Sequence, residues 1–291
     1  MVAPPEAPLL SLRALREQAC LILTEAGIEN PQQESDWLLI AALPVKRHAL
    51  TLDGDQHVPP SELERAMEMV NRRARREPLQ YVLGTQEFRS LEIAVTPDVL
   101  IPRPETELLV EEALQSLLDV RNPVVADVGT GSGCVAISIA KECPRSTVAA
   151  TDISRPALGV ARANAISAGV CSRVRFFQAD LLGAFARGAF HAIVCNPPYI
   201  PSEEIDRLQP EVSRYEPRQA LNGGEDGLAY YRRLLADTPS RLRHGGHLIL
   251  ELGYLQAQIV KNMAASTEDW SSVLCRKDAA GIERILVARR A

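Results

Sequence analysis

Residues 124–133, VVADVGTGSG, decide the fold, because a strand-like apolar run passes directly into three closely spaced glycines. The first five residues have the composition of a buried strand, and residues 134–141 after the glycines have the pattern of a helix. Glycine adopts a positive φ at little cost and lets the backbone approach a ligand closely. A strand-to-helix turn alone needs one or two glycines, so Gly129, Gly131 and Gly133 favour a ligand-binding loop.

The chain after this loop alternates between strand-like and helix-like segments. Helices are expected at residues 156–168, 228–242 and 256–265. Strands are expected at residues 147–151, 174–178, 192–195, 247–252, 272–276 and 284–288. This alternation predicts an α/β fold with a Rossmann-like sheet that is mostly parallel and carries helices on both faces.

The first part of the chain carries helix signals instead. Ser11 can cap an amphipathic run, Pro31 can occupy the first turn of a second helix, and Ser61-x-x-Glu64 has the pattern of a capping box. The segment after it, QEFRSLEIAV, alternates like a short hairpin. We therefore expect a small all-helical domain for substrate recognition, a hairpin linker and a Rossmann-like domain, at residues 1–85, 86–100 and 101–291.

The composition excludes several classes of protein. The 291 residues carry a net charge of −5, and no run approaches the ~18 apolar residues of a membrane span. The start lacks the features of a signal peptide, and the six scattered cysteines fit neither a zinc site nor a disulfide framework. We expect a cytoplasmic protein with no membrane, metal or nucleic-acid partner. Arg72, Arg73, Arg75 and Arg76 could form a nucleic-acid patch, but the glutamates among them favour a solvated helix face.

The spacing of the glycine loop separates two classes of ligand. A dinucleotide fingerprint has the pattern Gly-x-Gly-x-x-Gly, but its last position is Cys134 in this chain. The observed Gly-x-Gly-x-Gly resembles the first motif of S-adenosylmethionine-dependent methyltransferases. On this resemblance the cofactor-binding loop is Gly129, Thr130, Gly131, Ser132 and Gly133.

Acidic residues follow the next two predicted strands. Asp152 ends the second strand, where a carboxylate can accept both ribose hydroxyls of the cofactor or can cap the following helix. The glycine loop upstream favours the ribose function. Asp180 and Leu181 end the third strand, where they can contact the adenine.

The fourth strand ends in Asn196-Pro197-Pro198-Tyr199, in which neither proline can donate a hydrogen bond to a sheet. In a doubly wound sheet this strand lies beside the first, so its end faces the glycine loop. The Asn196 side-chain oxygen and the Pro197 carbonyl can then hold both protons of an NH2 group, while Tyr199 offers a flat surface. We expect Asn196, Pro197 and Tyr199 to be catalytic, Pro198 to belong to the substrate site, and Asn196 also to face the cofactor. The alternative is that these four residues only form a turn at the end of the strand.

Longer segments resemble one family. LQYVLG at 79–84, LIPRPETE at 100–107, NPPYI at 196–200 and ALNGGEDGL at 220–228 resemble the bacterial release factor glutamine methyltransferase family. The resemblance implies N5-methylation of the glutamine in the Gly-Gly-Gln motif of peptide chain release factors. S-adenosyl-L-methionine would be the methyl donor and S-adenosyl-L-homocysteine the product. Some members carry an aromatic residue where this chain has Leu181, so aliphatic contact with the adenine is expected instead.

Several alternatives stay open. A related glutamine methyltransferase that acts on a ribosomal protein would share these motifs. A nucleic-acid amino-methyltransferase needs a basic recognition insert and a base-flipping pocket, and the segment between Tyr199 and Leu228 is too short for such an insert. A non-catalytic binding module would not need intact glycines together with Asp152 and Asn196. Residues 103–107 either line the pocket or only start a helix.

Overall fold

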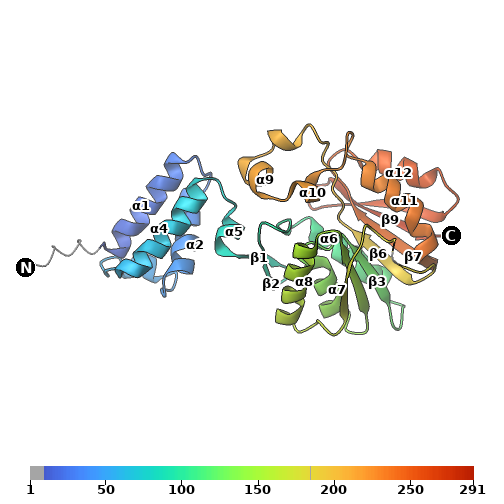
Figure 1. The fold of residues 1–291 in the computed structure, drawn as a ribbon, viewed down its shortest axis with the longest axis horizontal. Coiled ribbons are helices and arrows are strands. Elements are labelled where there is room, and N and C mark those ends of the chain that lie inside the picture. Colours follow the sequence, from blue (N-terminus) through green and yellow to red (C-terminus); the bar gives the residue numbers. More distant parts are fainter. Residues whose placement is uncertain (1–9, 184) are drawn as a thin grey trace, which may run out of the picture. The chain divides into compact units, whose positions relative to one another are not determined.

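The computed structural model describes residues 10–183 and 185–291, and the chain divides into two compact units (Figure 1). The first unit contains the described residues through Gly84 together with Pro210–Tyr215. The second contains Thr85–Gln209 and Glu216–Ala291. In the part of the chain that the structure describes, no helix has the length and apolar character needed to cross a membrane.

The first unit is helical. Its helix α1 begins after Ser11, whose hydroxyl accepts a hydrogen bond from the Ala14 amide at 3.3 Å, as the sequence predicts. Leu15 of α1, Leu39 of α2 and Ala66 of α4 lie in one buried cluster. The helices are α1 (Leu12–Glu25), α2 (Pro31–Ala42), α3 (Ala49–Leu52), α4 (Pro60–Ala74), α5 (Leu79–Leu83) and α9 (Pro210–Tyr215).

The capping box predicted at Ser61 and Glu64 is wrong. Helix α4 begins at Pro60, its N-cap residue is Pro59, and Ser61 already lies within the first turn. A proline at the first helical position has a φ suited to the helix and no N–H that needs a partner. The two prolines, and not the serine, therefore set this boundary.

The arginine run is only in part a solvated helix face, because Arg75 is exposed but Arg73 is only 6% exposed. Its guanidinium donates to Glu34 of α2 at 2.5 Å and to Glu211 of α9 at 2.9 Å. Arg76 also donates to Glu211, at 2.9 Å. One buried cation thus joins three helices of the first unit. The sequence carried no signal for this network, since Glu211 lies 138 positions after Arg73.

The second unit is built on a sheet that has seven strands in the described residues, in the order β5-β4-β3-β6-β7-β9-β8. The pairs from β5 to β7 are parallel, whereas β9 is antiparallel to both β7 and β8. The strands are β3 (Val124–Val128), β4 (Thr147–Asp152), β5 (Val174–Gln178), β6 (Phe190–Cys195), β7 (Leu242–Glu251), β8 (Trp270–Lys277) and β9 (Glu283–Arg290). The predicted α/β, Rossmann-like sheet is confirmed.

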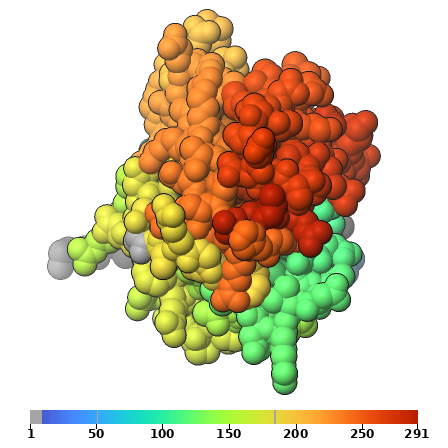
Figure 2. All heavy atoms as spheres, turned by 90° about the vertical axis from the view of Figure 1, so that its right-hand side faces the viewer, coloured from blue at the N-terminus to red at the C-terminus, as the bar shows by residue number. Residues whose placement is uncertain are grey.

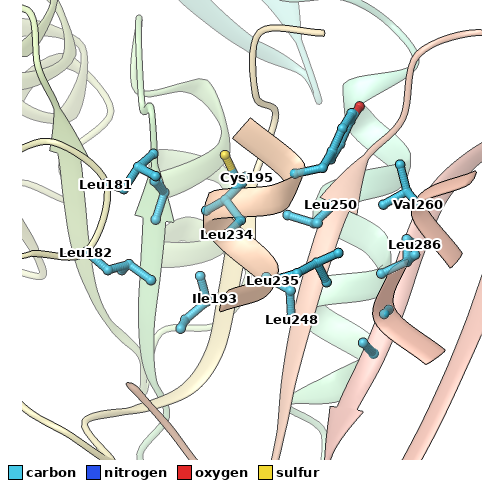
Figure 3. Close-up of a cluster of buried hydrophobic side chains, with 14 of the residues drawn as sticks. Leu181, Leu182, Ile193, Cys195, Leu234, Leu235, Leu248, Leu250, Val260 and Leu286 are labelled. Atoms are coloured by element: carbon cyan, nitrogen blue, oxygen red, sulfur yellow. The ribbon is translucent and has the colours of Figure 1, made fainter. Parts of the chain in front are cut away.

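Helices pack against this sheet, and a hairpin precedes it. Figure 3 shows Leu234 and Leu235 of α11 beside Ile193 and Leu248 of the sheet, within one buried apolar cluster. In Figure 2 the last segments of the chain, orange to red, gather mainly in the upper part of the view. The remaining elements are β1 (Thr85–Phe88) and β2 (Leu91–Ala94), which form the expected hairpin, α6 (Thr106–Ser116), α7 (Cys134–Glu142), α8 (Arg155–Ser167), η1 (Ile205–Arg207), α10 (Arg218–Leu221), α11 (Ala229–Arg241) and α12 (Ala257–Ala265).

Strand β7 begins at Leu242, well before the expected residue 247. The added segment, LRHGG, is polar and rich in glycine and lacks the β-branched and aromatic residues that are typical of strands. Its sequence therefore does not predict a strand. It pairs with β6 through Phe190 and Leu242, and a shift in register between Phe190 and Ala192 accommodates it. Helix α11 accordingly ends at Arg241.

We predict that Arg73→Ala lowers the free energy of unfolding of the helical unit by about 3 kcal/mol, because Glu34 loses its cation and Glu211 keeps only Arg76. A Trp270→Phe background leaves Trp37 of α2 as the only tryptophan, so its fluorescence during urea unfolding reports on this unit. Arg75→Ala removes an exposed side chain from the same helix end and should change the free energy by less than about 0.5 kcal/mol. Equal effects of the two substitutions would contradict the network.

Candidate functional site

The carboxyl ends of the parallel strands meet at one cleft of the second unit. In the sheet register, Val128 of β3 lies opposite Thr151 of β4 and Cys195 of β6, so the residues that follow these strands come together. Strand order reverses at β3, and such a switch point is where open α/β sheets bind ligands. The lining of the cleft includes Gly129, Gly131, Asp152, Asp180, Leu181, Asn196, Pro197 and Pro198.

The three loop glycines all have the backbone conformation that favours glycine, with φ of 71° at Gly129, 53° at Gly131 and 83° at Gly133. A Cβ on Gly133 would lie 3.0 Å from the Cβ of Ala161 in α8. A Cβ on Gly129 or Gly131 would meet no atom within 4 Å, and both residues line the cleft. Gly133 thus serves helix packing, whereas the other two leave open space beside exposed backbone.

Thr130 and Ser132 face inward beneath the loop, where they are 5% and 2% exposed. The Thr130 hydroxyl donates to the Asp127 carboxylate at 2.6 Å, and the Thr130 amide donates to the Thr151 carbonyl at 2.8 Å. Asp127 also accepts the Ala136 amide at 3.1 Å, while burial raises its pKa to about 6. Thr130 therefore holds the loop in shape, and neither Thr130 nor Ser132 is among the residues that line the main cleft.

Asp152 connects the end of β4 to the glycine loop. One carboxylate oxygen accepts the Gly131 amide at 2.9 Å and the other accepts the Ser154 amide at 2.8 Å. The cap of helix α8 is Ser154, whose hydroxyl accepts the Ala157 amide, so the helix-cap function considered for Asp152 belongs mainly to Ser154. A carboxylate has about four lone-pair sites, so Asp152 can still accept hydroxyl groups from the cleft.

Asp180 and Leu181 lie at the next strand end, and both line the cleft. Asp180 accepts a hydrogen bond from the Arg233 guanidinium at 2.7 Å, in a pair that is about half exposed. Leu181 is 8% exposed and has a φ of 50°, which is unusual for a leucine. Its side chain supplies an aliphatic wall.

The Asn196 amide is anchored on one side. Its Nδ2 donates to the Thr106 hydroxyl at 3.2 Å, and that hydroxyl donates to the Glu251 carboxylate at 2.7 Å. No described residue donates to the Asn196 Oδ1. This oxygen therefore stays available at the cleft, where Pro197 and Pro198 continue the lining.

Glu251 and the hydrogen bonds of Thr106 were not predicted from the sequence. Both residues are buried, at 2% and 3% exposed. Glu251 ends strand β7, which neighbours β6, so the register of Cys195 with Leu250 brings it beside Asn196. Burial raises the pKa of Glu251 to about 7. The available signal was an acid at the end of an apolar run, HLILE, the same signal that marked Asp152.

Tyr199 lies in a closely fitted socket. A Cβ on Gly223 would be 2.8 Å from the Tyr199 carbonyl carbon, a Cβ on Gly253 would be 2.9 Å from its ring, and a Cβ on Gly227 would collide with its carbonyl oxygen. Gln256 donates to that oxygen at 2.9 Å. The ring packs against the apolar cluster of the sheet and is not among the residues that line the cleft. Burial raises the pKa of its hydroxyl to about 12.

The LIPRPETE segment lies against the glycine loop. Leu100, Pro102, Arg103 and Thr106 line a smaller hollow together with the loop and Asn196. Helix α6 begins at Thr106, not at Pro104. The Arg103 guanidinium donates to the buried Glu216 carboxylate at 2.5 Å. Arg103 and Thr106 therefore lie on the pocket side, whereas the helix start considered at Pro104 is two residues too early.

The fold is that of one class of protein, the Rossmann-like methyltransferases. The hMettl16 catalytic domain, 16% identical, covers 82% of this chain and 85% of its own with a TM-score of 0.55. A methyltransferase from Pyrococcus furiosus, 19% identical, covers 75% and 98% with a TM-score of 0.50. At these identities the likeness concerns the fold alone. Among the described residues, no group of three or more His, Cys, Asp or Glu is placed to hold a metal ion.

Sequence relatives define the family. A family model described as the PrmC N-terminal domain matches residues 14–84, and one described as the methyltransferase small domain matches residues 104–209. The release factor glutamine methyltransferase of Geobacter sulfurreducens is 44% identical over 92% of both chains. That of Moorella thermoacetica is 41% identical over 97% of this chain and 99% of its own. The chain belongs to the release factor glutamine methyltransferase family, and it is an enzyme.

We predict that Gly227→Ala destabilises the second unit by more than 2 kcal/mol, because it adds a clash with Tyr199 to the cost of a positive φ, about 1–2 kcal/mol. Gly169→Ala is the matched control, since Gly169 has a φ of 71° and open space around it. In a Trp37→Phe background, urea unfolding followed by Trp270 fluorescence measures both. If the two substitutions cost the same, the socket around Tyr199 is not tight.

Proposed function

We propose that this enzyme transfers the methyl group of S-adenosyl-L-methionine to the N5 amide nitrogen of the glutamine in the Gly-Gly-Gln motif of peptide chain release factors. The observation that carries the proposal is the anchored Asn196 amide, whose free oxygen lies at the cleft beside the glycine loop. The names of the relatives, release factor glutamine methyltransferases, support the substrate.

The residues of the cleft fit the proposed cofactor, which supplies an electrophilic sulfonium methyl group when bound. Gly129 and Gly131 leave room for its methionine end to approach the backbone. The Asp152 carboxylate would accept the ribose hydroxyls and is held in place by its bonds to the Gly131 and Ser154 amides. Asp180 and Leu181 would contact the adenine, Leu181 through its aliphatic side chain.

An amide nitrogen is a poor nucleophile, because its lone pair is delocalised into the carbonyl. The Asn196 Oδ1 and the Pro197 carbonyl would accept one N–H each, which fixes the nitrogen and directs its lone pair at the methyl group. Transfer would form the nitrogen–methyl bond as the sulfur–methyl bond of the donor breaks, with one amide proton passing to solvent and S-adenosyl-L-homocysteine as the other product.

The residues after Asn196 would shape the entrance for the substrate. Pro197 and Pro198 edge the cleft, so a glutamine preceded by two glycines enters without a β-carbon clash. We propose that Tyr199 assists as a fixed surface near the amide, supported by its place in the motif, although its ring also packs into the core. The helical unit, where the PrmC N-terminal domain model matches, would recognise the rest of the release factor.

Labelled methyl transfer tests the proposal, with mass spectrometry to locate the product. We predict transfer to the Gly-Gly-Gln glutamine of purified release factor, and none to a version in which that glutamine is alanine. Because the enzyme carries a net charge of −5, transfer should weaken with added salt if the release factor presents a basic surface.

The enzyme variants give the matching controls. Asn196→Ala should lower the rate by about 10²–10³, the usual effect of removing one preorganised polar contact. Asn262→Ala replaces an exposed asparagine of α12 outside the cleft and should leave the rate unchanged. Label that appears mainly in ribosomal protein, DNA or RNA would refute the assignment, as would label retained in the alanine version of the release factor.

A further inference from the structure

We propose that Thr106 and Glu251 are positioning residues that decide which end of the Asn196 amide faces the substrate, and that ionisation of Glu251 switches this orientation. The inference rests on the proposed function, because it concerns the oxygen that would accept the glutamine NH2. It assigns a function to two buried residues that do not touch the substrate themselves.

The direction of each hydrogen bond follows from what the groups can donate. An ionised carboxylate only accepts, so the single hydroxyl proton of Thr106 goes to Glu251, at 2.7 Å. The Thr106 oxygen can then only accept from Asn196, and it receives the Nδ2 group at 3.2 Å. The amide oxygen of Asn196 is left for the cleft. This series of hydrogen bonds runs from the Asn196 amide through the Thr106 hydroxyl to the Glu251 carboxylate. It therefore presents a hydrogen-bond acceptor to the substrate.

Protonation of Glu251 allows the hydrogen bonds between Glu251, Thr106 and Asn196 to reverse their direction. A neutral carboxyl can donate its proton to the Thr106 oxygen, and the Thr106 hydroxyl is then free to donate to the Asn196 Oδ1. The Asn196 amide would turn its NH2 group toward the cleft. An Asn196 NH2 group cannot accept a hydrogen bond from the NH2 group of the substrate glutamine. The enzyme would then no longer orient the nucleophilic nitrogen.

The surroundings of Glu251 make the switch accessible near neutral pH. The largest influence is burial, which disfavours the charged form and raises the pKa to about 7. The Thr106 hydrogen bond lowers the pKa, Glu105 raises it, and Arg284 and Arg103 lower it. The other titratable groups whose pKa values respond to the Glu251 charge are Cys134, Cys195, Tyr199 and Tyr231. Because the pKa is raised, the carboxylate is present above about pH 7 and is lost as the pH falls through that value.

A purely structural explanation makes a different prediction. A buried threonine and glutamate could simply satisfy each other while they pack α6 against β7. Their removal would then reduce stability without changing how the rate depends on pH. The pH profile of the transfer step therefore separates the two explanations.

The experiment measures single-turnover methyl transfer to intact release factor between about pH 5.5 and about pH 8.5, the range that brackets such a pKa. The wild-type rate should rise with an apparent pKa near 7. Glu251→Gln should flatten this profile, since its amide does not titrate. Thr106→Val should lower the rate about fivefold or more, the value of one hydrogen bond, and Thr106→Ser should restore most of it.

Two controls make the outcome decisive. Thr238→Val removes another buried hydroxyl, one that donates only to the Leu234 carbonyl within α11, and should leave the rate and its pH profile as in the wild type. Calorimetric titration with S-adenosyl-L-methionine should give wild-type affinity for the Thr106 and Glu251 variants. If Glu251→Gln does not fold, the wild-type pH profile and the rates of Thr106→Val and Thr106→Ser still distinguish the two explanations.

The two proposals fail in different ways. No transfer to release factor by the wild-type enzyme at any pH would refute the proposed function. Transfer with a flat wild-type profile, or a Thr106→Val rate equal to that of the wild type, would overturn the positioning inference alone.

Discussion

Parallel pairing of β3 with β4 on one side and β6 on the other is the constraint on which the site depends. It brings the glycine loop, Asp152 and Asn196 to one sheet edge, although they are distant in sequence. Strand β7 then adds Glu251 beside Asn196. Since side-chain direction in a strand alternates with each residue, a slip of one residue in any of these pairings would turn the site residues away from the cleft.

Buried carboxylates hold the polar side of this edge in place. Asp127 accepts the loop hydroxyl of Thr130, and Glu251 accepts the hydroxyl that anchors Asn196. Burial raises the pKa of both acids, to about 6 and about 7, so each is costly to keep ionised. Hydrogen bonds from fixed donors offset part of this cost, and a low-dielectric surrounding strengthens those bonds. The buried charges lower the stability of the folded protein, but their hydrogen bonds preorganise the reacting groups.

The local signals of the sequence predicted much of the molecule. Alternating strands and helices predicted the Rossmann-like sheet, and residues at successive strand ends predicted a cleft lined by Gly129, Asp152 and Asn196. Long-range partners could not be predicted. The ion pair of Arg73 with Glu211 and the bond of Thr106 with Glu251 join residues 138 and 145 positions apart. Such pairs depend on packing, which periodicity does not encode. The packing of the Tyr199 ring against the apolar cluster of the sheet could likewise not be predicted from the sequence.

We propose that the Asn196 oxygen and the Pro197 carbonyl hold the two amide protons of the substrate glutamine. A crystal structure of the enzyme with S-adenosyl-L-homocysteine and a peptide that contains Gly-Gly-Gln measures this directly. We expect the glutamine nitrogen about 3 Å from both oxygens, with the Asn196 Nδ2 still bonded to Thr106. A glutamine that turns its carbonyl oxygen toward Asn196, or that lies outside the cleft, would contradict it.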